Sequence, residues 1–131
     1  MKIKKFTFNS FQENTYIVHS NKECMIIDPG CNNPEEENLI KKYISENQLI
    51  PKELINTHCH LDHIFGNHFI ANTYNLTPKM HERDLPLLTK AVDIAKLYNV
   101  SLNPPPLNVK TICENDVISL GNTSWEVIFT P

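Results

Sequence analysis

The chain has 131 residues, of which 40% are hydrophobic and 21% charged, and its formal net charge at pH 7 is −3. This length is enough for one domain with its own hydrophobic core, which we assign to residues 1–131. The composition has no basic surplus and no acidic tail, so we expect no nucleic-acid partner. Residues 1–11 alternate lysine with apolar side chains, unlike a signal peptide, and no apolar run is long enough to span a membrane.

The first third of the chain predicts three strands and a helix. Strands are expected over residues 2–8, 15–19 and 23–28, and a turn over residues 11–14. Asn33 is a favourable N-cap, followed by Pro34 in the first helical position, so a helix is expected over residues 34–46. Its apolar side chains recur at helical spacing: Leu39, Ile40, Tyr43 and Ile44.

The rest of the chain continues with alternating strands and helices. A short strand over residues 53–56 precedes a helix that starts at residue 62 or 63 and ends near residue 74. The further expected elements are a strand at 78–81, a helix at 82–98, and strands at 109–112, 117–120 and 123–129. This local pattern predicts a mixed α/β domain and nothing more specific.

Four metal-binding side chains lie within six positions between an apolar strand and a helix. They are His58, His60, Asp62 and His63. On extended backbone His58 and His60 project to the same face, and Asp62 keeps that alternation. Imidazole nitrogen and carboxylate oxygen are ligands that zinc and its neighbours in the first transition series prefer. An adjacent Asp-His pair is better spread over two metals than one, so the cluster predicts a metallohydrolase.

The string His58-x-His60-x-Asp62-His63, with Thr57 before it, resembles the metallo-β-lactamase fold superfamily and most of all its glyoxalase II-like hydrolases. The resemblance extends upstream to Asn14-Thr15-Tyr16 and to residues 26–30, so it covers nearly the whole chain. It implies the N-terminal portion of a four-layered αββα sandwich.

The resemblance also implies a role for each motif residue. His58 and His60 would hold the first metal, Asp62 and His63 the second, and Asp62 would orient the attacking nucleophile as the catalytic residue. The complete site would hold two zinc ions, with iron or manganese as alternatives.

Two further residues are candidates for supporting this site. Asp28 could accept an N–H from a ligand imidazole, which would fix the tautomer of that histidine, or it could simply be a turn residue before Pro29. Thr57 could orient the loop through its hydroxyl, or it could be an ordinary threonine at the end of a strand.

The ligand set within the 131 residues is short of what the resemblance implies. In the family a strand ending like Phe129-Thr130-Pro131 leads into a Gly-His loop, and here no histidine follows His81. We therefore expect the N-terminal part of a longer hydrolase, impaired or inactive on its own. We also expect uncovered sheet surface that favours self-association.

The implied reaction is attack of a hydroxide, shared between two cations, on the carbonyl of a small molecule such as a thioester, another ester or an amide. A glyoxalase II-like thioesterase is the first expectation. Other branches of the fold are the alternative: a lactonase, a phosphodiesterase or nuclease, or a persulfide dioxygenase. A non-catalytic binding or assembly fragment is the third. Four cysteines without a Cys-x-x-Cys pair predict reduced thiols and a cytoplasmic location.

Overall fold

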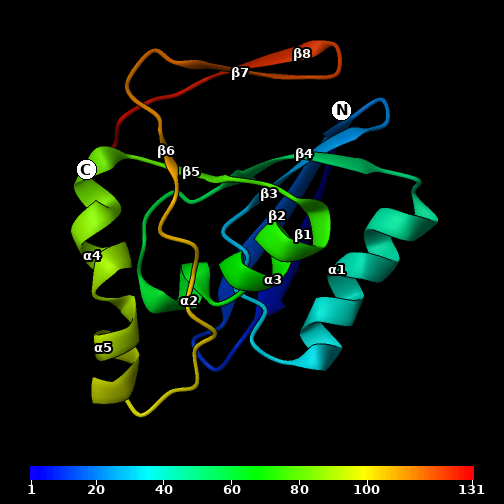
Figure 1. Ribbon diagram of the computed structural model, residues 1–131. Coiled ribbons are helices and arrows are strands. Elements are labelled where there is room, and N and C mark those ends of the chain that lie inside the picture. The colour runs from blue at the N-terminus through cyan, green and yellow to red at the C-terminus, as the bar shows by residue number, and fades with distance from the viewer.

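The computed structural model describes residues 1–131 and contains one large and one small β-sheet (Figure 1). The large sheet has six strands in sequence order: β1 (Lys2–Phe8), β2 (Glu13–Ser20), β3 (Glu23–Ile27), β4 (Ile50–Ile55), β5 (Pro78–Met80) and β6 (Lys110–Thr111). The first three strands form an antiparallel meander, whereas β3 to β6 pair in parallel. The small sheet is an antiparallel hairpin of β7 (Val117–Leu120) and β8 (Thr123–Glu126).

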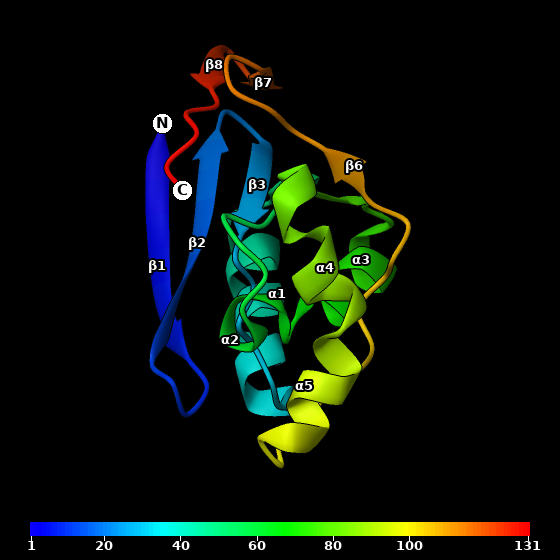
Figure 2. The same cartoon turned by 90° about the vertical axis from the view of Figure 1, so that its left-hand side faces the viewer.

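The helices lie on one side of the large sheet and the β7–β8 hairpin lies on the other (Figures 1 and 2). The α-helices are α1 (Pro34–Glu46), α2 (Leu61–Ile64), α3 (Asn67–Tyr74), α4 (Leu85–Thr89) and α5 (Ala91–Leu97), with a 3₁₀ turn at Glu82–Asp84. None of these helices has the length and hydropathy that a membrane-crossing helix requires.

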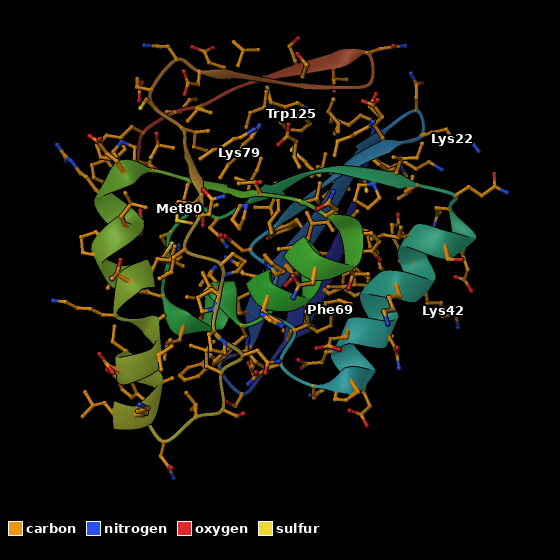
Figure 3. All side chains as sticks on the ribbon, in the orientation of Figure 1. Lys22, Lys42, Phe69, Lys79, Met80 and Trp125 are labelled. Carbon is orange, nitrogen blue, oxygen red and sulfur yellow. The ribbon has the colours of Figure 1, made fainter.

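Alternation along the central strands builds the two layers of the core. Ile17, Ile26 and Leu54 face the helices and pack with Ile40 and Ile70. Their neighbours along the strands, Val18, Met25 and Ile55, face the opposite way and pack against Ile118 and Leu120 of the hairpin. Trp125 of β8 also points toward the large sheet, while Lys22 and Lys42 project outward (Figure 3). The expected mixed α/β class is confirmed, and the layers are helices, large sheet and small sheet.

Several expected elements match closely. The strand at residues 2–8 and the helix at residues 34–46 have the expected bounds. The N-cap is also as expected, because Asn33 Oδ1 accepts the Glu36 N–H at 2.8 Å. Other strands differ at their ends. β2 begins at Glu13, inside the expected turn, β4 begins at Ile50, and β8 ends at Glu126.

The expected helix from residue 62 or 63 to residue 74 is wrong, because α2 and α3 are separated by Phe65 and Gly66. Gly66 donates its N–H to Pro29 O at 2.7 Å. A Cβ on Gly66 would lie 2.8 Å from that oxygen and would collide with Cys31 Sγ. The turn after β3 therefore packs directly against the break, which keeps residues 57–63, the segment with the four predicted metal-binding side chains and here called the metal loop, close to β3.

The expected helix at residues 82–98 is also wrong, since it consists of a 3₁₀ turn and two short helices. His81 Nδ1 accepts the Arg83 N–H at 3.2 Å and starts the 3₁₀ turn. α4 then ends at Thr89, and Lys90, with φ of −91° and ψ of 2°, separates it from α5, which begins at Ala91. Apolar residues of both helices nevertheless share one core, as Leu88, Ala91 and Ala95 are buried in the same cluster.

We predict that Gly66→Ala destabilises the protein by about 1–3 kcal/mol, because the added methyl group overpacks a closed contact. Urea unfolding followed by circular dichroism measures the change. Asn38→Ala on the exposed face of α1 is the matched control and should change the unfolding free energy by less than about 0.5 kcal/mol. Equal midpoints for Gly66→Ala and the unmodified protein would contradict the proposed packing.

Candidate metal centre

The site forms where two parallel strands end at the same edge of the large sheet. β3 ends at Ile27 and β4 ends at Ile55, and the strands are paired in register there. Asp28 follows β3 in the left-handed region, with a φ of 49°, a conformation that aspartate tolerates better than most residues. Its N–H donates to Ile55 O at 2.9 Å, so the first residues beyond both strands lie side by side.

The four predicted metal-binding side chains converge beyond β4. The His58 ring centroid lies 4.7 Å from that of His60 and 4.0 Å from that of His63. His63 Nε2 lies 3.4 Å from Asp62 Oδ2. Ligand atoms of Asp28, His58 and His63 all lie within 4.8 Å of one another, and this group includes neither His60 nor Asp62.

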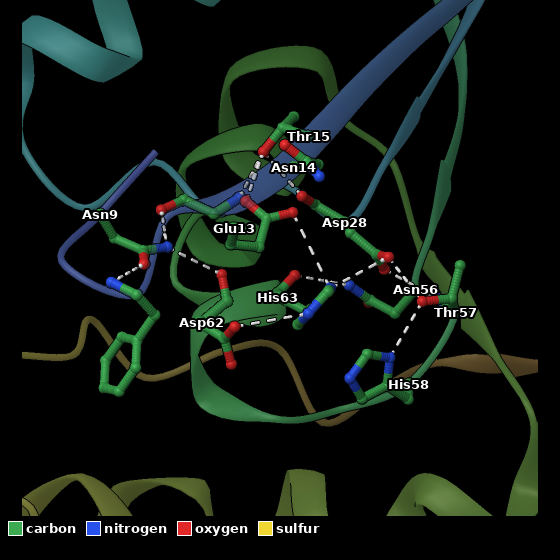
Figure 4. A network of polar contacts seen from close by, with 12 residues as sticks. Asn9, Glu13, Asn14, Thr15, Asp28, Asn56, Thr57, His58, Asp62 and His63 are labelled. Atoms are coloured by element: carbon green, nitrogen blue, oxygen red, sulfur yellow. Dashed lines mark hydrogen bonds and ion pairs between the residues drawn. The ribbon is translucent and has the colours of Figure 1, made fainter. Parts of the chain in front are cut away.

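Asp28 and Thr57, the two predicted supporting residues, contact these histidines directly (Figure 4). Thr57 donates its N–H to Asp28 Oδ1 at 2.7 Å and its hydroxyl to Oδ2 at 2.5 Å. Its hydroxyl oxygen also lies 3.0 Å from His58 Nδ1. Because the single hydroxyl hydrogen is used on Asp28, the oxygen accepts from His58 Nδ1–H. The His58 lone pair is therefore on Nε2.

Asp28 also contacts His63. His63 Nδ1 lies 3.1 Å from Asp28 Oδ2, an ion-pair contact without hydrogen-bond geometry, and His63 Nε2 faces Asp62. Burial lowers the pKa of His63, but the Asp28, Asp62 and Glu13 carboxylates outweigh it, so the net shift is upward. The pKa of His58 is lowered, first by burial and then by His63.

Glu13 is a buried carboxyl group beside His63 that sequence reasoning missed. Its side chain is 0% exposed, and its Oε1 lies 3.8 Å from His63 Nδ1 without a hydrogen-bond partner. Burial raises the pKa of Glu13 to about 8, against a smaller lowering by the Thr15 hydrogen bond. A charged residue at the start of a strand normally faces solvent, so no sequence signal indicates this burial.

The hydrogen bonds around Thr15 also favour a protonated Glu13. Thr15 Oγ1 accepts the Gly30 N–H at 2.9 Å and lies 2.8 Å from Asp28 O and 2.9 Å from Glu13 Oε2. One hydroxyl hydrogen cannot serve two acceptors. The Asp28 carbonyl can only accept, so a proton on Glu13 Oε2 satisfies the groups that meet at Thr15 Oγ1. Gly30 is required here, since a Cβ would collide with the Glu13 carboxyl group.

An amide pair, also missed from the sequence, holds the two ends of the metal loop together. Asn56 Nδ2 donates to Asn67 Oδ1 at 3.1 Å, and Asn67 Nδ2 donates to Asn56 Oδ1 at 2.8 Å. Asn56 Nδ2 also donates to His63 O at 3.1 Å. Both amides are buried, so they fix β4, the loop and α3 as one unit. Asp84 also supports the metal loop, because its Oδ1 accepts the Cys59 N–H at 2.9 Å between His58 and His60.

The residues present fit a transition-metal ion. Two imidazoles and a carboxylate lie within ligand distance of one another, His60 and Asp62 are adjacent to them, and the Thr57 contact leaves Nε2 of His58 available. His58 and His60 also line a cavity of about 620 Å³ whose wall includes His81 and Phe129. The His81 ring stacks on Phe129 at a centroid distance of 4.5 Å, apart from the donor cluster.

Comparison with known proteins identifies the family. The model of the metallo-beta-lactamase superfamily matches residues 9–131, and the chain belongs to this superfamily. The fold agrees: a crystal structure of the B3 metallo-beta-lactamase BLEG-1 superposes with a TM-score of 0.83 at 20% identity, over 99% of this chain and 62% of that one. Another neighbour, TTHA1623 in a di-iron-bound form, has a TM-score of 0.73 and 29% identity, over 86% of this chain and 55% of that one.

Among curated relatives, the probable metallo-hydrolase YqgX of Bacillus subtilis is 27% identical over 134 residues, which cover 100% of this chain and 61% of the relative. A shorter stretch is 44% identical over 62 residues to the hydroxyacylglutathione hydrolase of Buchnera aphidicola, covering 47% of this chain and 23% of that enzyme. The chain thus spans about three fifths of the length of YqgX and corresponds to an N-terminal portion of the fold.

We predict that Glu13 makes the metal-free protein less stable as pH rises. The folded pKa is about 8 and the ordinary value 4.5, so between them the folded state holds a proton that the unfolded state has released. The unfolding free energy therefore falls across this window. Glu13→Gln keeps a neutral side chain and should remove this contribution, becoming the more stable protein at pH 9 while matching the unmodified chain near pH 4. Urea unfolding in the presence of a chelator, repeated from pH 4 to pH 9, measures the unfolding free energy of both proteins. If the two free energies depend on pH in the same way, Glu13 is not protonated in the folded state.

We predict that Asp28→Asn lowers metal affinity by about 10- to 100-fold, the usual effect of losing a carboxylate behind a ligand histidine. Asparagine tolerates the left-handed backbone as aspartate does, so the fold is retained. Competition with a chromophoric zinc chelator measures the affinity. Asp93→Asn on the exposed face of α5 is the control. An equal metal affinity in both variants would show that Asp28 does not contribute to metal binding.

Proposed function

We propose that the complete protein is a metal-dependent hydrolase that cleaves a thioester, or another ester or amide, of a small molecule. The observation that supports it is the convergence of His58, His60, Asp62 and His63 at the C-terminal edge of a sheet of this superfamily. Bound divalent cations supply Lewis acidity and bring the pKa of water near 7. The protein residues then position the groups that react.

Each residue has a defined part in this proposal. His58 and His60 would hold one cation, and Asp62 and His63 would hold the other. Asp62 would also accept a hydrogen bond from the attacking water and so orient it. Asp28 lies against Nδ1 of His63, and the Thr57 hydroxyl oxygen accepts the Nδ1–H of His58. Two cations need more than these four donors. Both ring nitrogens of His68 already have partners, Pro104 O at Nδ1 and the Asn72 amide at Nε2.

The substrate class and the metal are proposed from fewer observations than the reaction type. A glyoxalase II-like thioesterase is favoured by the 62-residue match to the Buchnera hydroxyacylglutathione hydrolase. Zinc suits three histidines and a carboxylate, and the di-iron form of TTHA1623 supports iron as the alternative. A cytoplasmic location is supported by four free cysteines, three of them buried.

The test is hydrolysis of acyl thioesters by the complete, zinc-loaded protein, followed by the thiol released. We expect Asp62→Asn to lower kcat/KM by about 10²- to 10⁴-fold, because the group that orients the nucleophile loses its charge. His68→Gln, on the exposed face of α3, should leave the rate unchanged. The chain of residues 1–131 alone should be impaired. Thioester hydrolysis that is insensitive to Asp62→Asn would rule out this site.

A further inference from the structure

A groove of about 470 Å³ lies beside the metal loop and shares His60 and Leu87 with the His81 cavity. This volume is within the roughly 300–1,000 Å³ of small-molecule pockets. Its floor is formed by Cys59 and Leu61, which are buried. His60 and Asp62 line one end, so the groove is continuous with the donor cluster.

One wall of the groove is Phe11, which is held in place by the metal loop. The Phe11 N–H donates to Asn9 Oδ1 at 2.9 Å, and Asn9 Nδ2 donates to Asp62 O at 3.1 Å and to Gly30 O at 3.0 Å. The turn between β1 and β2 is therefore braced against the residue at the start of α2. Phe11 is nevertheless 51% exposed, since only its Phe65 side is covered.

The opposite wall comes from α4 and α5. Leu87 and Ile94 are partly buried, whereas Leu97 is 82% exposed and Tyr98 65% exposed. Phe11, Leu97 and Tyr98 are among the large exposed hydrophobic residues of the chain, and all three meet at this groove. Apolar side chains that gather around a concave surface mark a binding site rather than scattered exposure.

The charges of the groove narrow the class of ligand. No lysine or arginine lines it, and its only carboxylate is Asp62. An anionic group would therefore find no cationic partner along the walls. The lining suits an uncharged apolar chain whose polar end lies near His60 and Asp62.

We propose that this groove binds the acyl chain of the substrate, so that the preferred substrates are medium-chain acyl thioesters or esters. The proposal rests on the proposed function and specifies its substrate class. The chain lies between Phe11 and Leu97, with the carbonyl beside His60 and Asp62. In the reaction the C–S bond breaks, the hydroxyl of water joins the acyl carbon, and the remaining proton ends on the thiol or in solvent.

The kinetic test uses the complete zinc-loaded protein and acetyl, butanoyl, hexanoyl and octanoyl thioesters of N-acetylcysteamine, an uncharged thiol. We expect kcat/KM to rise about two- to fourfold for each added methylene that enters the groove. Leu97→Glu should lower the octanoyl value at least tenfold and remove the rise of kcat/KM with chain length. Leu107→Glu, at a residue that is 61% exposed and outside the groove, should keep the chain-length dependence.

A second measurement is independent of turnover. Octanamide, which is uncharged and not a thioester, is titrated into the metal-free complete protein and followed by NMR. We expect octanamide to change the NMR chemical shifts of the groove residues in the unmodified protein and in Leu107→Glu. We expect no such changes in Leu97→Glu.

The outcomes separate the two proposals. If octanamide changes the chemical shifts of the groove residues but no thioester is hydrolysed, the proposed function is overturned while the apolar binding site is retained. Hydrolysis that is independent of chain length, without groove shifts, would overturn the acyl site and leave the hydrolase. A change of oligomeric state in Leu97→Glu with an unchanged chain-length dependence would identify the groove as a protein interface and also overturn the acyl site.

Discussion

The carboxylate of Asp28 is the contact on which the geometry of the site depends. It accepts two hydrogen bonds from Thr57 and lies against the Nδ1 of His63, so one buried side chain connects the end of β3 with both sides of the metal loop. A buried carboxylate is costly unless its oxygens are hydrogen-bonded, and here both are. Its position follows from the parallel pairing of β3 and β4, which brings the two strand ends together.

The surroundings make that contact rigid. Gly66 lets the turn after β3 pack against the break between α2 and α3, and the Asn56–Asn67 pair closes the loop from the other side. Glu13 lies beside His63, and burial raises its pKa to about 8, which favours the neutral form. His58 and His63 are thus contacted by side chains that the fold itself positions, as ligand histidines commonly are.

Local chemistry accounts for what the sequence predicted well. Asn33 and Pro34 define the start of α1, and the His-x-His-x-Asp-His string indicates the donor cluster without knowledge of the fold. The breaks at Gly66 and Lys90 were not predictable, because they arise from tertiary contacts that override helical periodicity. Glu13 and the Phe11–Leu97 groove were not predictable either. Each depends on bringing together residues that are distant in the chain, and neither has a local signal. The ligand roles themselves stay predictions.

The Asn9 side chain has a thermodynamic consequence. It connects the backbone of Asp62, a proposed metal ligand, to the turn that carries Phe11. If metal binding restrains Asp62, it also restrains one wall of the groove, and the two binding events share part of the same ordering cost. Such coupling is reciprocal, so a ligand in the groove strengthens metal binding by the same factor by which the metal strengthens ligand binding. Metal content and occupancy of the groove would then report on each other.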